Sequence, residues 1–403
     1  MRTEVQLTPA AGLLRGVVDC VDRERLERRL NSGAELRIKF GVDPSAPDIH
    51  LGHTVPMRLL RRWQECGHLP ILIIGDYTAR IGDPTGRSVT RPQLTVAEVE
   101  ENTKTYLRQL YSVVDEGRVE LHYQSEWYGD FGLDKVLELA RTTTVAQLLQ
   151  RADFDQRMSN QQAIGVHELF YPLLQGYDSV AIRADVELGG TDQLFNLLRG
   201  REVQQEYGLA PQDIITVPLL VGLDGERKMS KSFGNAVAVA ESADQQYGQL
   251  MSAPDSVTLR YLELLTDTDP QELAQLRAGL EAGTVHPRNL KAEMAARVVQ
   301  LFHGEEGAAA AAAEFARVFR DKQLPANIPE VVLLAEPIEA RDLLVQTKMA
   351  TSRSEAGRLI FQGAVRIDEM RLESREAHLE LRDGSILRVG PRRVVRLRIA
   401  PPP

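Results

Sequence analysis

The stretch Leu36-Arg37-Ile38-Lys39-Phe40-Gly41, with the helical pattern of residues 52–66 and the run Ile71-Leu72-Ile73-Ile74-Gly75, decides the fold. The first run predicts a short strand, and the last is apolar throughout, as in buried parallel strands. Between them, apolar residues recur at helical spacing up to Gly67. A strand–helix–strand unit of this kind builds doubly wound α/β sheets, whose ligands bind beyond the carboxyl ends of the strands. We therefore predict a Rossmann-like domain with a parallel sheet.

The rest of the chain extends this unit in both directions. Residues 8–31 are expected to form an amphipathic helix, and residues 180–183 and 214–221 further strands, with a helix over 192–207 between them. Residues 243–325 have an almost wholly helical pattern, and 325–329 is a Pro-containing linker. These patterns predict three domains: a Rossmann-like domain at 1–242 with a mainly helical insertion at 92–170, an α-helical domain at 243–328, and a small α+β domain at 336–403.

Composition bounds the class of protein. The chain has 403 residues and a net charge of −9, which argues against a protein that coats nucleic acid or membrane over its whole surface. Residues 331–403 nevertheless carry 13 Lys and Arg against 10 Asp and Glu, which suggests an anionic partner for this part. Two cysteines, no signal-peptide pattern and no apolar run near membrane-spanning length predict a soluble, cytoplasmic protein without a membrane partner.

The first chemical motif is His50-Leu51-Gly52-His53, at the strand-to-helix turn. A helix N-terminus offers free amides and the positive end of the helix dipole to a phosphate. Gly52 leaves space for a flat base near the backbone, and the two histidines share one helical face. Alone, the motif is also compatible with a purely structural role, in which one histidine caps the helix and the other lies in the core.

The second motif is Lys228-Met229-Ser230-Lys231-Ser232, on a loop bounded by Gly225 and Gly234. Two lysines on such a loop can close over a polyphosphate and stabilise charge that develops in the transition state. A solvated basic loop is the simpler alternative. With the histidines, the loop predicts ATP chemistry at an α-phosphate.

Together the two motifs resemble the signature pair of class I aminoacyl-tRNA synthetases. Other segments resemble bacterial tyrosyl-tRNA synthetases in the order of that family, and the resemblance covers nearly the whole chain. They are Phe40-Gly41-Val42-Asp43-Pro44, Ile81-Gly82-Asp83-Pro84-Thr85-Gly86, Tyr171-Pro172-Leu173-Leu174-Gln175-Gly176-Tyr177-Asp178 and Gly189-Gly190-Thr191-Asp192-Gln193.

The resemblance implies roles for particular residues. Phosphate handling falls to His50, His53, Lys228 and Lys231. ATP binding falls to Gly41, Asp43, Gly52, Asp192, Met229 and Lys231, with Asp192 on the ribose hydroxyls. Tyrosine binding falls to Asp83, Tyr171, Gln175, Asp178 and Gln193, with Asp178 accepting a hydrogen bond from the phenol. Taken singly, Asp83 is equally compatible with a turn and Asp178 with a helix-end cap.

One position departs from the family pattern. Many relatives carry a Tyr near the end of the first strand that also touches the phenol, whereas this chain has Lys39 followed by Phe40. A strand lysine is usually solvated at a sheet edge, which is the simplest expectation here. Alternatively, Lys39 pairs with Asp178 and keeps that carboxylate ionised.

The C-terminal part resembles the S4-type RNA-binding fold over residues 341–368. Ser352 is predicted to cap a helix, with Glu355 in the reciprocal capping position. The candidates for RNA binding are Lys348, Ser352, Arg353, Arg358 and Arg366. Few aromatic residues are present, so contacts to the RNA backbone are expected rather than base stacking.

The resemblance implies a tyrosyl-tRNA synthetase that uses ATP with Mg²⁺, without a metal site on the protein. Its expected partners are tyrosine, tRNA(Tyr) and a second copy of the chain, joined through the insertion. Two alternatives remain open at this point. A tryptophanyl-tRNA synthetase shares the fold and both motifs, and a non-catalytic RNA-binding protein could be built on the same scaffold.

Overall fold

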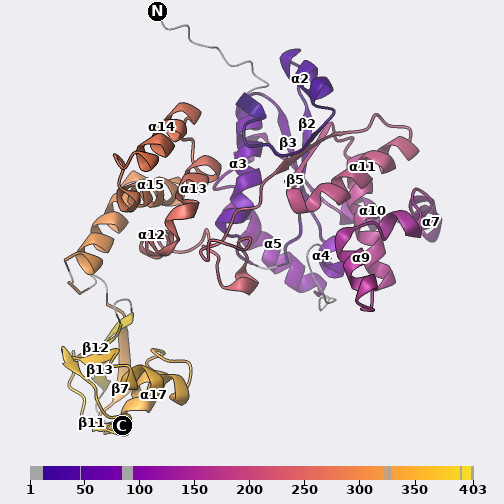
Figure 1. Ribbon diagram of the computed structural model, residues 1–403. Coiled ribbons are helices and arrows are strands. Elements are labelled where there is room, and N and C mark those ends of the chain that lie inside the picture. Colours follow the sequence, from indigo (N-terminus) through magenta and orange to yellow (C-terminus); the bar gives the residue numbers. More distant parts are fainter. Residues whose placement is uncertain are drawn as a thin grey trace, which may run out of the picture. The chain divides into compact units, whose positions relative to one another are not determined.

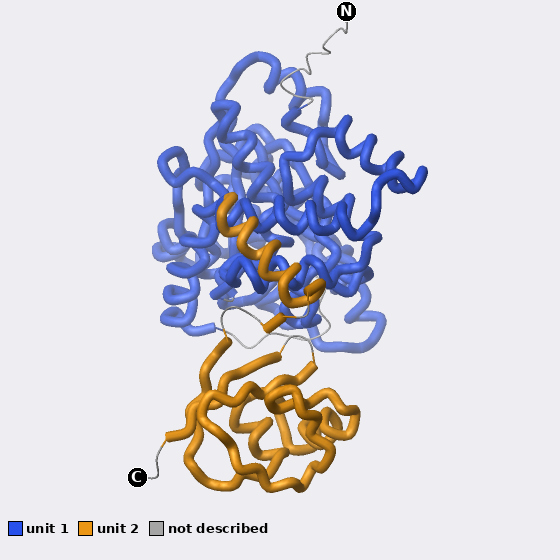
Figure 2. The backbone as a smooth tube through the Cα atoms, turned by 90° about the vertical axis from the view of Figure 1, so that its left-hand side faces the viewer, with its two compact units in different colours: residues 1–304 blue, residues 305–403 orange. Residues whose placement is uncertain are grey.

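The computed structural model describes residues 12–45, 47–83, 94–321, 323–324, 328–390 and 393–400. The chain forms two compact units, residues 1–304 and residues 305–403 (Figure 2). In the described part, no helix is both long and apolar enough to cross a membrane. The three domain boundaries predicted from the sequence remain predictions.

The first unit is built on a six-stranded sheet in the order β1-β6-β5-β2-β3-β4. All neighbouring pairs are parallel except β1 with β6. The strands are β1 (Cys20–Val21), β2 (Arg37–Val42), β3 (Leu69–Ile74), β4 (Glu120–Tyr123), β5 (Val186–Gly190) and β6 (Asp213–Val217). The strand order reverses between β2 and β5, and a doubly wound sheet binds its ligands at such a switch point.

Helices cover the sheet on both faces. Figure 1 shows α3 (Leu51–Glu65) on one side of β2, β3 and β5, and α10 (Val166–Ala181) and α11 (Leu194–Glu206) on the other. Trp63 of α3 is almost fully buried, as are the side chains of Ile71 to Ile74 in β3. The other helices are α2 (Arg23–Asn31), α4 (Thr78–Ile81), α5 (Val96–Leu110), α6 (Ser125–Tyr128), α7 (Leu133–Ala140), α8 (Val145–Leu148) and α9 (Ala152–Ser159), with the short 3₁₀ helices η1 (Glu116–Arg118), η2 (Thr191–Gln193) and η3 (Lys231–Phe233).

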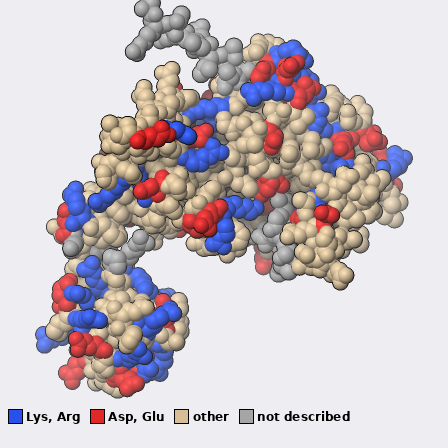
Figure 3. Space-filling view, in the orientation of Figure 1, with Lys and Arg blue, Asp and Glu red and all other residues tan. Residues whose placement is uncertain are grey.

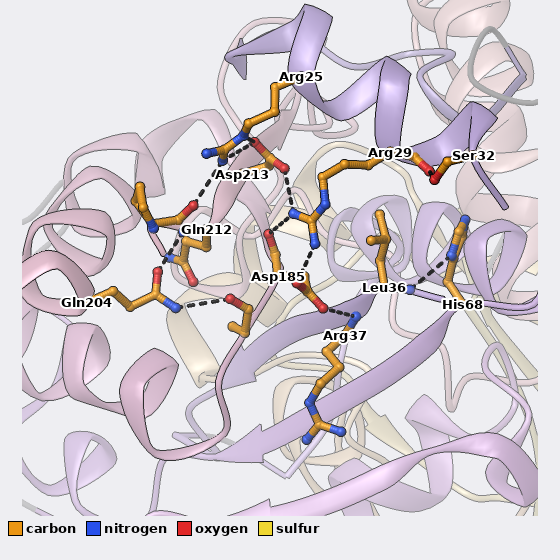
Figure 4. Close-up of polar contacts among 12 residues, drawn as sticks. Arg25, Arg29, Ser32, Leu36, Arg37, His68, Asp185, Gln204, Gln212 and Asp213 are labelled. Atoms are coloured by element: carbon orange, nitrogen blue, oxygen red, sulfur yellow. Dashed lines mark hydrogen bonds and ion pairs between the residues drawn. The ribbon is translucent and has the colours of Figure 1, made fainter. Parts of the chain in front are cut away.

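A polar network fixes the amino-terminal ends of the strands (Figure 4). Arg29 forms ion pairs with Asp185 and with the fully buried Asp213, and Arg25 donates to Asp213 at 3.0 Å. Asp185 also accepts from the backbone N–H of Arg37, at the start of β2, at 2.9 Å. Charged partners therefore occupy the amino-terminal ends of the strands. The carboxyl ends are where sheets of this kind bind their ligands.

A helical region follows the sheet in the chain, and after it comes the second, smaller unit. Its elements are α12 (Ala243–Ser252), η4 (Asp255–Val257), α13 (Thr258–Leu265), α14 (Pro270–Glu281) and α15 (Pro287–Phe319), and Gly304 interrupts α15 with a φ of 73°. The second unit has a five-stranded sheet in the order β10-β9-β12-β13-β7. Its elements are β7 (Glu330–Leu334), β8 (Ile338–Glu339), α16 (Ala340–Gln346), α17 (Arg353–Phe361), β9 (Val365–Ile367), β10 (Met370–Arg371), β11 (His378–Leu379), β12 (Ile386–Val389) and β13 (Arg393–Ala400).

The strand–helix–strand unit and the helices over 192–207 and 243–325 are confirmed among the described residues. The strand predicted at 180–183 is wrong, because α10 continues to Ala181 and the strand is β5. A four-residue apolar run does not distinguish a buried helix from a strand. The single helix predicted over 8–31 is also wrong beyond residue 11, since β1 precedes α2. Residues 8–11, 84–86 and 325–327 lie outside the described residues.

Candidate active site

Two imidazoles close the N-terminus of α3. The Nδ1 atom of His50 accepts from the Gly52 N–H at 3.2 Å, and Nδ1 of His53 accepts from the His50 N–H at 3.1 Å. The ring centroids lie 3.9 Å apart. Because both Nδ1 atoms accept hydrogen bonds, each neutral ring carries its proton on Nε2. The histidine cap is therefore real, and it leaves two Nε2–H donors for a ligand.

Both rings are neutral at physiological pH. Burial, the neighbouring His53 and Lys231 lower the pKa of His50 to about 2. Burial and Lys231 lower the pKa of His53 to about 4. Gly52 suits this position, because a Cβ there would lie 3.0 Å from the His50 ring, a tight contact that the ring would have to relieve by shifting.

The segment that follows the lysine loop, residues 237–239, is joined to this helix terminus. The Leu51 N–H donates to the Val237 carbonyl at 3.0 Å, and the Val239 N–H donates to the Ile49 carbonyl at 2.9 Å. Met229 is buried, and its N–H donates to the Leu220 carbonyl at 2.7 Å. The two motifs, separated by nearly 180 residues, thus form one backbone-linked structure.

Asn235, which the sequence did not single out, fixes the loop conformation. Its Oδ1 accepts from the Ser230 N–H at 2.8 Å, and its Nδ2 donates to Asp224 at 2.9 Å and to the Lys228 carbonyl at 3.2 Å. The side chain is almost fully buried. Gly222 makes room for it, since a Cβ there would lie 2.2 Å from Asn235 Nδ2.

Carboxylates hold both lysines of the loop. Lys228 Nζ lies 3.0 Å from Asp192 Oδ2, and Lys231 Nζ lies 3.4 Å from Asp48 Oδ2. Asp192 is in η2, beyond the end of β5, so the structure brings together this predicted ribose ligand and a predicted phosphate ligand. Both lysine side chains remain partly exposed.

A second group of predicted residues lies between the ends of β2 and β5 and helix α10. Tyr171 donates its hydroxyl to Asp43 at 2.7 Å, which Thr78 also contacts at 2.7 Å. Gln193 donates to Asp83 at 2.7 Å. These contacts tie Asp43, predicted for ATP, to the predicted tyrosine-binding residue Tyr171. Gly41 is exposed at the end of β2, with nothing within 4 Å of the position where a Cβ would be.

Arg151 supports this group, although the sequence analysis missed it. Its guanidinium contacts Asp83 at 3.0 Å, Asp153 at 2.7 Å and the Asn196 amide oxygen at 3.1 Å. The side chain is 4% exposed. The buried guanidinium of Arg151 therefore holds the carboxylate of Asp83 in place.

Asp178 is buried inside α10 and is not a helix-end cap. It accepts from Gln124 at 2.8 Å, from the Trp127 indole at 3.1 Å and contacts the Tyr128 hydroxyl at 3.3 Å. Burial raises the pKa of Asp178 to about 7, although the nearby Lys39 lowers it. These three partners, from the segment around α6, were not identified from the sequence.

Lys39 is not solvated at an edge, which corrects the simplest expectation for it. It lies in β2, inside the sheet, with no exposed surface. Its Nζ lies 2.9 Å from Glu187 and donates to the Gln175 carbonyl at 2.5 Å and to the Ser179 hydroxyl at 2.8 Å. The proposed direct pair with Asp178 is therefore also wrong, because Glu187 is the partner. The Gln175 amide donates to the same Glu187 at 3.1 Å.

The RNA-binding candidates lie in the second unit. Ser352 caps α17 by accepting from the Glu355 N–H at 3.2 Å. Glu355 instead binds the N–H of Thr351 at 2.8 Å, so the predicted reciprocal cap is wrong. Arg353 is paired with Glu339 at 2.6 Å, and Arg366 lies 3.7 Å from Glu369.

Lys348 and Arg358 are exposed and form no ion pair with any residue that the structure describes. Figure 3 shows Lys and Arg side chains interspersed with acidic ones over this unit.

The sequence profile of the family "tRNA synthetases class I (W and Y)" matches residues 31–320. Solved structures share the fold. One is a C-terminally truncated mitochondrial tyrosyl-tRNA synthetase from Aspergillus nidulans, with a TM-score of 0.65 and 23% identity over 78% of this chain and 96% of that one. A tyrosyl-tRNA synthetase complexed with L-tyrosine from Archaeoglobus fulgidus is another (TM-score 0.61, 23% identity, 75% and 98%). Fold and paired motifs thus define a class I tRNA synthetase.

Curated relatives specify the amino acid. The tyrosine--tRNA ligase of Moorella thermoacetica is 48% identical over 96% of this chain and 94% of its own length. That of Thermotoga maritima is 46% identical over 96% of both chains. The chain belongs to the tyrosine--tRNA ligase family, which confirms the resemblance, and it uses ATP to join tyrosine to tRNA.

Proposed function

We propose that tyrosine activation takes place in the crevice beyond the carboxyl ends of β2 and β5. The tyrosine carboxylate attacks the α-phosphorus of ATP in line, which gives tyrosyl-adenylate and pyrophosphate. The 3′-terminal adenosine hydroxyl of tRNA(Tyr) then attacks the acyl carbon and releases AMP. The observation that carries this proposal is the backbone link between the histidine-capped end of α3 and residues 237–239, which directly follow the lysine loop. This link holds two kinds of hydrogen-bond donor to phosphate, imidazoles and ammonium groups, in one place.

The histidines and lysines have separate electrostatic tasks. His50 and His53 offer neutral Nε2–H donors, because their low pKa values keep them uncharged. Lys228 and Lys231 supply positive charge, which opposes the charge that develops as pyrophosphate leaves. Imidazole N–H and ammonium groups suit phosphate oxygens rather than a metal ion. Mg²⁺ is therefore proposed to enter with ATP, as part of the substrate.

The ribose and phosphate assignments imply an exchange of partners. Asp192 is proposed to bind the ribose hydroxyls, yet it holds Lys228 at 3.0 Å. Binding of ATP would replace this contact with two new ones, ribose on Asp192 and phosphate on Lys228. Gly41, Gly52 and Met229 would line the path of the adenosine, where open space beside Gly41 supports a close approach.

Tyrosine is proposed to lie between Tyr171 and Asp178, on one face of α10. The amine would meet Tyr171, Asp83 and Gln175, with Gln193 toward the carboxylate. Asp178 would accept a hydrogen bond from the phenol hydroxyl. Its carboxylate has lone pairs to spare, in addition to those that accept from Gln124 and Trp127. Arg151 orients the Asp83 carboxylate through their ion pair, which supports the proposed role of Asp83 toward an ammonium group.

The tRNA and dimer assignments extend beyond this crevice. Residues 243–328 and 336–403 are proposed to hold tRNA(Tyr), the latter with Lys348 and Arg358, which are free of ion pairs in the described part. A homodimer through the insertion is supported by exposed apolar side chains there: Leu133, Leu137, Val145, Met158 and Val166. Sedimentation velocity would test it, and a monomer at micromolar concentration would contradict it. The cytoplasmic location is likewise proposed.

Lys231→Ala tests the active-site assignment. The variant should lower the rate of adenylate formation at saturating substrates far more than it lowers tyrosine affinity, because the loop acts mainly in the transition state. Lys104→Ala, which removes an exposed lysine of α5, is the matched control and should change neither. Equal losses of rate and tyrosine affinity in Lys231→Ala would contradict the role.

A further inference from the structure

A second basic hollow lies on the C-terminal half of α3, away from the histidine-capped end. Its volume is about 240 Å³, and its lining includes Arg58, Arg61, Arg62, Glu65, Asp267 and Phe302. All of these residues belong to the first unit. Arg62 follows His50 by three turns of helix, or about 18 Å at the rise of an α-helix. The hollow is therefore separate from the ATP crevice.

The three arginines of α3 differ in their partners. Arg58 pairs with Asp267 at 2.5 Å, and Arg61 pairs with Glu65 at 2.7 Å. Arg62 forms no hydrogen bond or ion pair with any residue in the described part of the chain. It is only partly exposed and lines the hollow.

Like charges surround Arg62. Burial, and then Arg15 and Arg58, lower the pKa of its guanidinium, against the opposing effects of Asp267 and Glu65. Arg15 is fixed nearby because it donates to the Thr268 carbonyl. Four arginines, Arg15, Arg58, Arg61 and Arg62, thus lie beside two carboxylates, Asp267 and Glu65, which leaves an excess of positive charge. A partly buried charge without a partner is unfavourable, and an anion would relieve it.

The chemistry of the hollow fits a phosphate group. Guanidinium forks bind phosphate oxygens through paired hydrogen bonds. A volume of about 240 Å³ holds a tetrahedral anion with several waters, each of which takes about 30 Å³.

We propose that this hollow is a second anion site, in which Arg62 binds a phosphate group with support from Arg58 and Arg15. The site goes beyond the proposed function, which uses the phosphates of ATP at the other end of α3. The phosphate group belongs either to an RNA backbone or to a free phosphorylated compound, and the experiment distinguishes these sources.

The first measurement is the melting temperature of the full chain in sodium phosphate against sodium chloride at matched pH and ionic strength. It is made in the Lys228→Met/Lys231→Met background, so that neither lysine of the loop can bind phosphate. Arg62→Gln should weaken the affinity for phosphate about tenfold or more. In chloride alone it should melt at the same or a higher temperature, because a repulsive charge is removed, which also shows that it folds. Arg28→Gln, an exposed arginine of α2, is the control and should change neither value.

The second measurement is the binding of a tRNA transcript to the same variants. Weaker binding of both phosphate and transcript in Arg62→Gln assigns the site to the RNA backbone. Weaker binding of phosphate alone assigns it to a free phosphorylated compound. Equal phosphate affinity with and without Arg62 would overturn the proposal. Tyrosine-dependent pyrophosphate–ATP exchange should be unchanged in Arg62→Gln when the loop lysines, including Lys231, are intact. A failure of the anion-site proposal is therefore distinct from a failure of the proposed function.

Discussion

Replacement of Lys39 by Met should destabilise the first unit, because it breaks an ion pair that is buried on both sides. Lys39 has no exposed surface, Glu187 is 1% exposed, and their charged atoms lie 2.9 Å apart. Met fills a similar volume but leaves the Glu187 carboxylate without a cation. The carbonyl of Gln175 and the hydroxyl of Ser179 also lose their donor.

The size of the effect follows from what remains around Glu187. Removal of one partner of a buried pair costs about 3–5 kcal/mol. Gln175 and Gln212 still donate to Glu187, so we expect the lower end, about 3 kcal/mol. The double variant Lys39→Met/Glu187→Gln removes both charges and should recover at least about 2 kcal/mol of this, since replacing a whole buried pair is often nearly neutral.

Urea unfolding followed by tryptophan fluorescence measures this, because the two tryptophans, Trp63 and Trp127, both lie in the first unit. Lys104→Met is the matched control: its ion pair with Glu101 is exposed, and its loss should cost about 0.5 kcal/mol or less. A double variant as unstable as Lys39→Met alone would refute the buried pair. So would a cost for Lys39→Met equal to that of Lys104→Met.

Three further outcomes are expected. Burial raises the pKa of Asp178 to about 7, above its unfolded value near 4, so stability should fall as pH rises from about 4 to 7. Asp178→Asn should flatten this slope in urea midpoints, and an unchanged slope would count against the buried carboxyl. With pKa values of about 2 and 4 at His50 and His53, pyrophosphate–ATP exchange at saturating tyrosine should show no imidazole titration between pH 6 and 8. An inflection near pH 6.5 that disappears in His50→Asn would show a charged imidazole instead. Asn235→Ala should lower the exchange rate about tenfold with little change in tyrosine affinity. The variant loses hydrogen bonds that total about 1–2 kcal/mol and act on the loop alone. An unchanged rate would show that the loop holds its shape without Asn235.

Local patterns were enough to predict the core of the fold. Apolar runs and a helical period placed β2, α3 and β3, and the turn before α3 placed the histidines at a helix N-terminus. The pairing of the two motifs followed from chemistry, because imidazoles and lysines share phosphate as a ligand. The structure adds the physical link, a short antiparallel bridge between His50 and Ala238.

Contacts between distant segments could not be predicted in this way. Lys39 looked like an edge lysine, because nothing near it in the sequence shows that β5, which begins at Val186, would pair beside β2. Trp127 reaches Asp178 from a segment whose pattern predicted a mainly helical insertion, and β4 within it was missed. Arg151 was overlooked for the same reason, since its partner Asp83 belongs to another part of the fold.

The most direct test of the central claim, that this crevice activates tyrosine, is amino-acid-dependent pyrophosphate–ATP exchange by the full chain. Tyrosine, phenylalanine and tryptophan are compared at equal concentrations, with wild type and Lys231→Ala side by side. The account predicts exchange with tyrosine alone, and its loss in Lys231→Ala. Exchange with tryptophan but not tyrosine, or undiminished exchange in Lys231→Ala, would contradict it.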